Sequence, residues 1–272
     1  MLHSAWRASP FRTCLFAFAR IKSWKLSFYR IFVSRMDIFP KPRTMKQGST
    51  LRPFDLFIII CTVGSALAYS LIRGQFELLG SVALLMGVTG TVLSAKRSIW
   101  NFLFGAVNVT LYAVIAYKTS NYGQAALNAL YYLPMQFVGW WLWTRRKEKG
   151  EKSKVQSRSM TPRQIVVAVL GTVLGTLLLW FVLSRYTDAS QPLKDGFVTT
   201  VFIVGQILMT LAFWQQWFFW LAGNVLNVAL WAVVMAEGEM LGGLMLIKYS
   251  MYTINSINGI LIWYRGAKKI EN

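Results

Sequence analysis

Eight apolar stretches of about 20 residues each occupy nearly the whole chain between Pro53 and Tyr264. The hydrocarbon core of a bilayer is about 30 Å thick and needs roughly 20 apolar residues per helix. Only 14% of the residues are charged, against about 25% in soluble domains. The stretches therefore predict eight transmembrane helices, at 53–72, 76–95, 99–117, 124–143, 164–184, 197–214, 217–236 and 241–264.

Lys and Arg residues are distributed unevenly between the loops. Of 29 such residues, 24 fall on one side of the membrane if the N-terminus is cytoplasmic, in 1–52, 96–97, 144–163 and 265–272. Cytoplasmic loops are enriched in Lys and Arg, so both termini are predicted to be cytoplasmic. The net charge of +19 thus reflects orientation in a membrane, and no nucleic-acid partner is expected.

Residues 1–52 form a basic extension with no acidic residue before Asp37. Such a segment resembles an organellar transit peptide or a basic amphipathic helix on a membrane surface. Met36 and Met45 are alternative starts directly before the first apolar stretch. We expect the extension to be disordered or dispensable, and removal of residues 1–35 to leave function intact.

An internal repeat divides the rest of the chain. Asn108-Val-Thr-Leu-Tyr112 matches Asn227-Val-Ala-Leu-Trp231, and the match continues, with one insertion, through the last helix of each half. We predict an all-α membrane protein with two parallel three-helix repeats, 76–143 and 197–264. A linker helix at 164–186 restores the orientation of the second copy, and the helix at 53–72 is an addition outside the repeat. Parallel repeats are a common transporter design, with the solute site where the copies meet.

Polar and aromatic residues recur on one face of helices in both repeats, at the spacing of a helical stripe. Unpaired polar groups in hydrocarbon are costly, so these stripes are candidates for lining a solute site. Asn108, Asn224 and Asn227 face either a ligand or a neighbouring helix, whereas Trp143 and Trp263 are expected in the aromatic belts at the membrane interface. The predicted substrate-binding residues are Asn101, Asn108, Tyr112, Asn128, Gln136, Trp214, Trp217, Asn224, Asn227, Trp231, Lys248, Tyr252 and Asn255.

Charged residues inside the spans are scarce. Lys248 is the one Lys or Arg well inside a predicted span, which makes it a functional candidate, although it could also snorkel or bond carbonyl groups. No Asp, Glu or His lies in the middle of a span, so proton coupling is not expected. No nucleotide-binding, metal-ligand or catalytic spacing is present, and we expect no cofactor, no metal and no enzymatic activity.

The motif pair resembles the PnuC family of transporters. The resemblance rests on Trp100-Asn101 with Gly105, Asn108 and Tyr112, on Gly223-Asn224 with Asn227 and Trp231, and on Tyr249 to Trp263 before Arg265. It implies a carrier in the bacterial inner membrane that takes up nicotinamide riboside, a vitamin B3 form and NAD precursor. It further implies facilitated diffusion with trapping by cytosolic phosphorylation, a helix arrangement like the SWEET sugar transporters, and a homotrimer.

Several alternatives stay open on the sequence. Thiamine, riboflavin or a sugar are other possible solutes of such a carrier. A membrane scaffold or a substrate-binding subunit that needs a partner is a different class of function. An intramembrane enzyme is the least favoured, because the spans offer only Lys, Tyr, Ser and Thr side chains as reactive groups.

Overall fold

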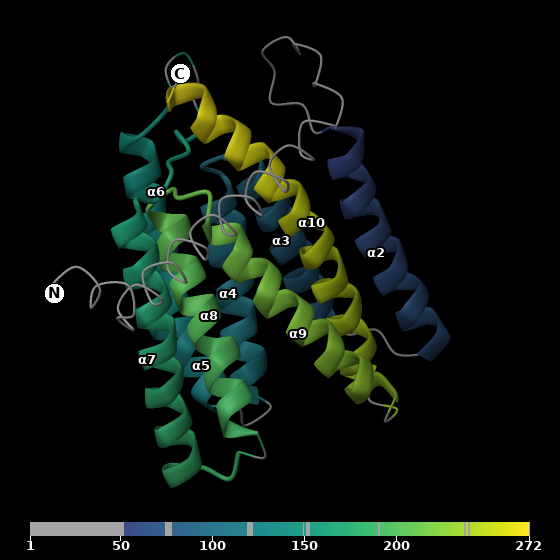
Figure 1. Cartoon of the computed structure of the whole chain (residues 1–272). Helices are drawn as coiled ribbons and strands as arrows, with labels where there is room; N and C mark the ends of the chain where they lie inside the picture. The colour runs from purple at the N-terminus through teal and green to yellow at the C-terminus, as the bar shows by residue number, and fades with distance from the viewer. Residues whose placement is uncertain are drawn as a thin grey trace, which may run out of the picture. The chain divides into compact units, whose positions relative to one another are not determined.

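The structure is a computed structural model that describes residues 52–73, 78–118, 122–148, 153–189, 191–236 and 240–271, with Gly150 and Gly238. Most of the expected basic extension, 1–51, lies outside these ranges. The described chain is helical, with only isolated β-bridges, which confirms the all-α class (Figure 1). The elements are α2 Pro53–Arg73, α3 Leu78–Ala95, α4 Asn101–Lys118, α5 Tyr122–Leu127, the π-helix η2 Asn128–Tyr132, α6 Leu133–Arg145, α7 Pro162–Tyr186, α8 Pro192–Thr210, α9 Gln216–Ala236 and α10 Met240–Glu271.

Since α5, η2 and α6 follow one another without a break, the described elements make eight continuous helical segments. Five of them, α2, α3, α7, α8 and α9, are long and apolar enough to cross a membrane by length and composition. The other three carry Asn, Gln, Tyr or Lys side chains that lower their hydropathy. Helix α10, with 32 residues, is about 48 Å long at 1.5 Å per residue. It therefore continues as a helix through residues 265–271, which belong to the basic segment 265–272 at the predicted cytoplasmic side.

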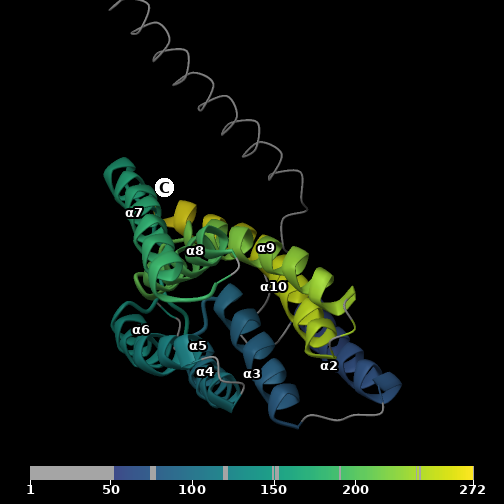
Figure 2. The same ribbon diagram turned by 90° about the horizontal axis from the view of Figure 1, so that it is seen from below.

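We call α3, α4 and the continuous segment α5–α6 the first half, and α8, α9 and α10 the second half. The third helix of each half also packs on the first helix of the other half. Helix α10 packs on α9 and also on α3, while α6 packs on α4 and also on α8. In addition, α2 packs on the α3 that follows it, just as α7 packs on the α8 that follows it (Figure 2). These neighbour relations of the second half repeat those of the first, but the two outer helices differ in one respect. Helix α2 also packs on α10, whereas α7 makes no comparable contact with α6 among the described residues.

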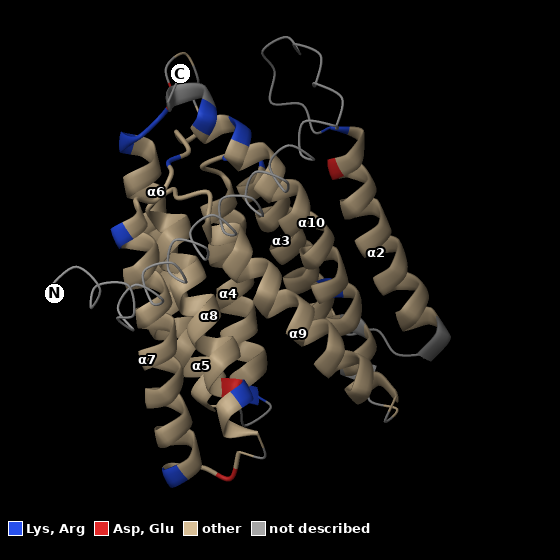
Figure 3. Cartoon of the chain, viewed as in Figure 1, with Lys and Arg blue, Asp and Glu red and all other residues tan. Residues whose placement is uncertain are grey.

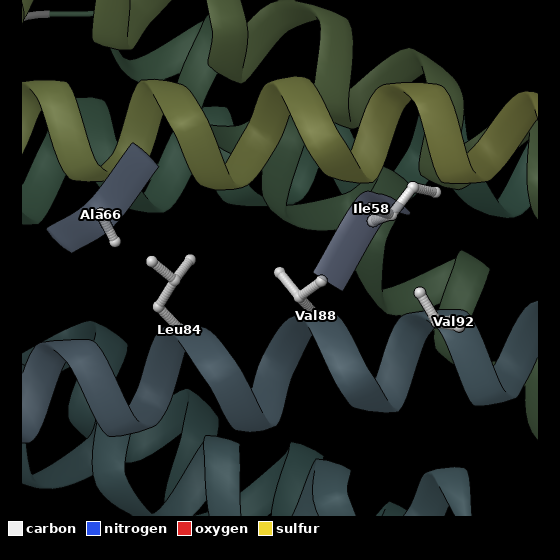
Figure 4. Close-up of a cluster of buried hydrophobic side chains, with 5 residues drawn as sticks. All are labelled: Ile58, Ala66, Leu84, Val88 and Val92. Atoms are coloured by element: carbon white, nitrogen blue, oxygen red, sulfur yellow. The ribbon is translucent and has the colours of Figure 1, made fainter. Parts of the chain in front are cut away.

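Helix α2 is fastened to α3 by apolar contacts and by one ion pair. Side chains spaced four apart on α3 form one face, and the cluster at this contact contains Ile58, Ala66, Leu84, Val88 and Val92 (Figure 4). At the start of α2, the carboxylate of Asp55 is 2.7 Å from the ammonium of Lys96, and the Asp55 side chain is almost completely buried. The ion pair fixes one end of α2 beside the turn that follows α3.

The turns between α3 and α4 and between α8 and α9 have the same backbone conformation. Arg97 has φ 63° and Ala212 has φ 62°, the left-handed region that ends many helices. Their N–H groups donate to the carbonyl oxygens of Ser94 and Met209, each at 2.9 Å. The two turns are separated by 115 residues in the sequence (97 and 212), whereas the two asparagine motifs are separated by 119 (108 and 227). The difference of four residues is about one helical turn. Measured from the preceding turn, Asn227 therefore lies about one helical turn farther along α9 than Asn108 lies along α4.

Residues 153–160 form a strap across the bundle end where these turns lie. On the first half, Val155 N–H donates to the Arg97 carbonyl at 2.9 Å. On the second half, Arg158 N–H donates to the Ala212 carbonyl at 2.9 Å. Ser157 Oγ donates to the Trp263 carbonyl of α10 at 2.9 Å. The segment expected to be a basic loop therefore connects both halves at this end, which we call the strap end.

Lys and Arg residues gather at the strap end, where α10 also ends (Figure 3). The opposite end carries fewer of them, together with acidic residues. This distribution matches the uneven loop charge of the sequence. The basic residues near the strap end include Arg97, Arg146, Lys154, Arg158 and Arg265.

Candidate functional site

The buried cation Lys248 lies among tyrosine rings contributed by both halves. Its Nζ is 4.8 Å from the ring centroid of Tyr112 on α4. It is 5.6 Å from the centroids of Tyr249 and of Tyr252. We call these four residues the tyrosine cage. Because Tyr112 belongs to the first half and the other three to α10, the cage lies where the two halves meet.

Asn108 lies beside this cage, against a glycine of α3. A side chain at Gly87 would collide with both the Tyr252 hydroxyl and the Asn108 amide oxygen. Only a residue without Cβ lets α4 and α10 bring these two polar groups so close to α3. The structure thus brings four predicted site residues together at one place: Asn108, Tyr112, Lys248 and Tyr252.

The asparagines of α9 are buried and face α10 or their own helix. Asn224 Nδ2 donates to Ser256 Oγ at 3.2 Å, and Asn227 Nδ2 donates to the Gly223 carbonyl at 2.9 Å. Asn255 on α10 reaches the other half, because its Nδ2 donates to the Thr91 carbonyl of α3 at 2.8 Å. Asn224 and Asn255 therefore join helices in this structure.

Three further predicted residues bond to nearby backbone. Asn101 Nδ2 donates to the Ser98 carbonyl at 2.6 Å, which places it in the turn at the strap end rather than in the cage. Asn128 Nδ2 donates to the Gln124 carbonyl at 2.9 Å, where the π-helix η2 begins. Gln136 Nε2 donates to the Tyr132 carbonyl at 3.2 Å. Short π-helical segments within α-helices are frequent at functional sites, so η2 makes this segment a candidate part of the site.

The tryptophans form a buried cluster toward the strap end. Trp217 is 3% exposed, and its ring packs over Gly259 of α10. Trp214 makes edge contacts with Phe218 and Tyr264, at centroid distances of 5.5 and 5.1 Å. Trp231 lies near the far end of α9 and is half-buried.

The expectation that Trp143 and Trp263 form interfacial belts is wrong. Both side chains are 0% exposed, and their rings are in contact, with centroids 5.5 Å apart. Each indole N–H donates to a carbonyl of the other half. Position near a helix end suggested the membrane interface, but these ends converge in the protein interior.

Several buried polar atoms have no hydrogen-bond partner within the described residues. Leaving such an atom unpaired costs about 1–3 kcal/mol, and convergent unpaired groups are typical of ligand sites. Sequence reasoning did not select Gln216, Tyr249 or Asn258, although Asn258 follows Asn255 by three residues on α10. The unpaired atoms include Asn108 Oδ1, Gln216 Nε2, Trp217 Nε1, Trp231 Nε1, Asn255 Oδ1 and Asn258 Nδ2.

The described residues contain no cluster of three His, Cys, Asp or Glu side chains that could hold a metal ion. The polar groups are amides, indoles, phenols and one ammonium. Groups of these kinds can bind a neutral or charged organic solute through hydrogen bonds and ring contacts. Membrane-length helices around such an interior define a carrier of small solutes.

Comparisons with known proteins identify the family. The model of the family described as nicotinamide mononucleotide transporter matches residues 77–265. The nicotinamide riboside transporter PnuC of Neisseria mucosa is 35% identical over 196 residues, 70% of this chain and 73% of its own. That of Haemophilus influenzae is 29% identical over 192 residues, 69% of this chain and 81% of its own. A crystal structure of the vitamin B3 transporter PnuC aligns with a TM-score of 0.69 and 32% identity, over 82% of this chain and 95% of that chain.

The chain belongs to the nicotinamide mononucleotide transporter family and is a PnuC-type transporter. It is a multi-pass membrane protein, and its family consists of transporters rather than enzymes. The resemblance found in the sequence is therefore confirmed.

Proposed function

We propose that this chain takes up nicotinamide riboside across a bacterial inner membrane, with both termini in the cytoplasm. The observation that carries the proposal is the buried, unpaired amide oxygen of Asn108, which lies beside the Tyr252 hydroxyl of the tyrosine cage. The riboside offers hydroxyl and carboxamide donors to such an acceptor, and its pyridinium ring suits Tyr and Trp faces. The names of the related proteins support the same solute.

The proposed site comprises the predicted substrate-binding residues, with roles that depend on their contacts. Asn108, Trp217 and Trp231 keep free hydrogen-bonding atoms and so are available to a ligand. Asn224, Asn227 and Gln136 already form hydrogen bonds within the protein, so they bind solute only by exchanging these partners. Tyr112 and Tyr252 supply ring faces.

Transport by alternating access requires the two halves to move relative to each other. The recurring neighbour relations and the matched turns at Arg97 and Ala212 support two parallel repeats that can do so. At the strap end, the contacts of the strap with both halves have to separate before solute can leave on that side. In the described spans, carboxylates lie only near helix ends, which favours facilitated diffusion, with cytosolic phosphorylation trapping the riboside for NAD synthesis.

Helix α7 supports a further part of the proposal, the homotrimer. It is strongly apolar, and only 6% of its spanning window is buried within the chain. Such a surface faces lipid or other subunits in a bilayer. Cross-linking in native membranes tests the trimer separately from transport.

The test of function is uptake of labelled nicotinamide riboside by liposomes that contain only the purified chain. Saturable uptake without an ion gradient or ATP supports the proposal and eliminates a scaffold or a partner-dependent subunit. Competition by unlabelled thiamine, riboflavin and glucose distinguishes the other solutes. If the riboside does not enter the liposomes but one of the other solutes does, that solute would replace nicotinamide riboside as the proposed substrate.

A further inference from the structure

No carboxylate among the described residues forms an ion pair with Lys248. Its side chain is 7% exposed, and neither salt bridge found among the described residues involves it. The carboxylates of the described chain are Asp55, Glu148, Asp188, Asp195 and Glu271, all near helix ends or in connecting segments. Lys248 instead lies nine residues into α10, within the tyrosine cage.

An ammonium buried without a counter-ion is costly. Removing an ion from water carries a large desolvation penalty, whereas a cation–π contact is a comparatively weak attraction. The three tyrosine rings therefore offset only part of the cost. Ionisable groups kept inside membrane spans against such a cost are functional by default.

The cage has the chemistry of a receptor for a small anion. An ammonium has three donors and no acceptor, and the three rings around it are phenols, which carry no negative charge at neutral pH. In contrast, a purely cationic solute would meet a like charge in surroundings of low polarity, where repulsion is strong. The ligand that fits Lys248 best is one that brings a negative group into the cage.

We propose that the site takes a pyridine riboside whose ring carries a carboxylate, and that Lys248 pairs with this carboxylate. The inference rests on the proposed riboside site and names its substrate class more closely. A carboxylate has nearly the size and shape of a carboxamide, so one site admits both.

Titration calorimetry on the full-length protein, with nicotinic acid riboside, nicotinamide riboside and nicotinamide mononucleotide, tests the proposal. The acid riboside is expected to bind about tenfold more tightly than the amide riboside. Lys248→Met reverses this order, because it removes the partner of the carboxylate and the repulsion of the cation. Lys248→Arg keeps the charge and keeps the preference for the acid.

The outcomes separate this inference from the proposed function. Binding of the amide riboside at least as tight as that of the acid, in the unchanged protein, overturns the inference and leaves the proposed function standing. If the mononucleotide binds most tightly, the inference is overturned, and the negative group that pairs with Lys248 is a phosphate instead of a carboxylate. Binding of none of the three contradicts the proposed function and this inference with it. The order of the three affinities in the wild-type protein tests the inference even if the Lys248→Met variant fails to fold.

Discussion

Trp143 and Trp263 make reciprocal hydrogen bonds between the two halves of the bundle. The indole N–H of Trp143 donates to the Met209 carbonyl at 3.0 Å, and that of Trp263 donates to the Ser94 carbonyl at 2.9 Å. Ser94 and Met209 occupy matching places at the ends of α3 and α8, and Ser94 Oγ lies 3.8 Å from Met209 Sδ. The four helix ends therefore converge on one buried point at the strap end.

Replacing either tryptophan by Phe should destabilise the protein to a similar degree. Trp143→Phe and Trp263→Phe each keep an aromatic ring but lose one buried donor and some volume, at a cost of about 1–3 kcal/mol. Thermal unfolding in detergent measures the loss. Trp141→Phe is the control, because Trp141 is 50% exposed. Equal melting temperatures for all three variants would contradict the reciprocal arrangement.

Alanine at Gly139 or Gly259 should disrupt the packing of each third helix. A Cβ at these positions would run into the rings of Phe102 and Trp217, respectively, and overpacking costs about 1–3 kcal/mol. Gly171→Ala is the matched control in a helix interior, because no heavy atom lies within 4 Å of its Cβ position. That control should be neutral or slightly stabilising. A melting temperature unaffected by the first two changes would disprove these contacts.

The effects of Asn108→Leu should distinguish a ligand contact from a structural one. Its amide oxygen is buried without a partner, so the substitution should leave the stability of the empty protein unchanged or raised. Binding of nicotinamide riboside should weaken about tenfold, the value of one hydrogen bond of about 1.4 kcal/mol. The measurement pairs a melting curve with calorimetry on the same sample.

Asn224→Leu provides the contrast, because Asn224 already bonds to Ser256. We expect this variant to abolish uptake and also to lower the melting temperature, and Asn227→Leu to abolish uptake while the protein still inserts and assembles. Normal uptake by both variants would move the solute site away from α9.

The ion pair between Asp55 and Lys96 should stabilise the attachment of α2. Asp55→Asn leaves Lys96, whose side chain is 15% exposed, with a partly buried charge, and we expect a loss of about 1–3 kcal/mol. Lys96→Met in the same background should restore part of the loss, giving a coupling energy in a double-mutant cycle. Strictly additive effects of the two changes would exclude a functional ion pair.

Much of the architecture follows from the sequence, because a helix that crosses the hydrocarbon core needs an apolar stretch of sufficient length. Such stretches predicted the spanning helices, and the all-α membrane class is confirmed. Helix ends and loop contacts depend on neighbouring segments, so the hydrophobic pattern of one segment does not predict them. The start of α8 at Pro192, earlier than the expected 197, reflects a proline that suits the first turn of a helix. The strap depends on hydrogen bonds between segments far apart in the sequence.

The candidate site was only partly predictable for the same reason. The stripe pattern selected Asn108, Tyr112 and Tyr252, and the rarity of charge selected Lys248. The pattern could not tell that Asn101 caps a local turn. Nor could it tell that Tyr249, next to Lys248, turns its ring toward the same ammonium.

We expect the interior of the bundle to bind nicotinamide riboside. Titration calorimetry on the purified protein, with thiamine, riboflavin and glucose as comparisons, is the most direct test of this claim. We expect saturable binding of the riboside and no binding of the three other solutes. Absence of riboside binding in a sample that remains folded would contradict the claim, and the solute of this transporter would then have to be sought among other small molecules.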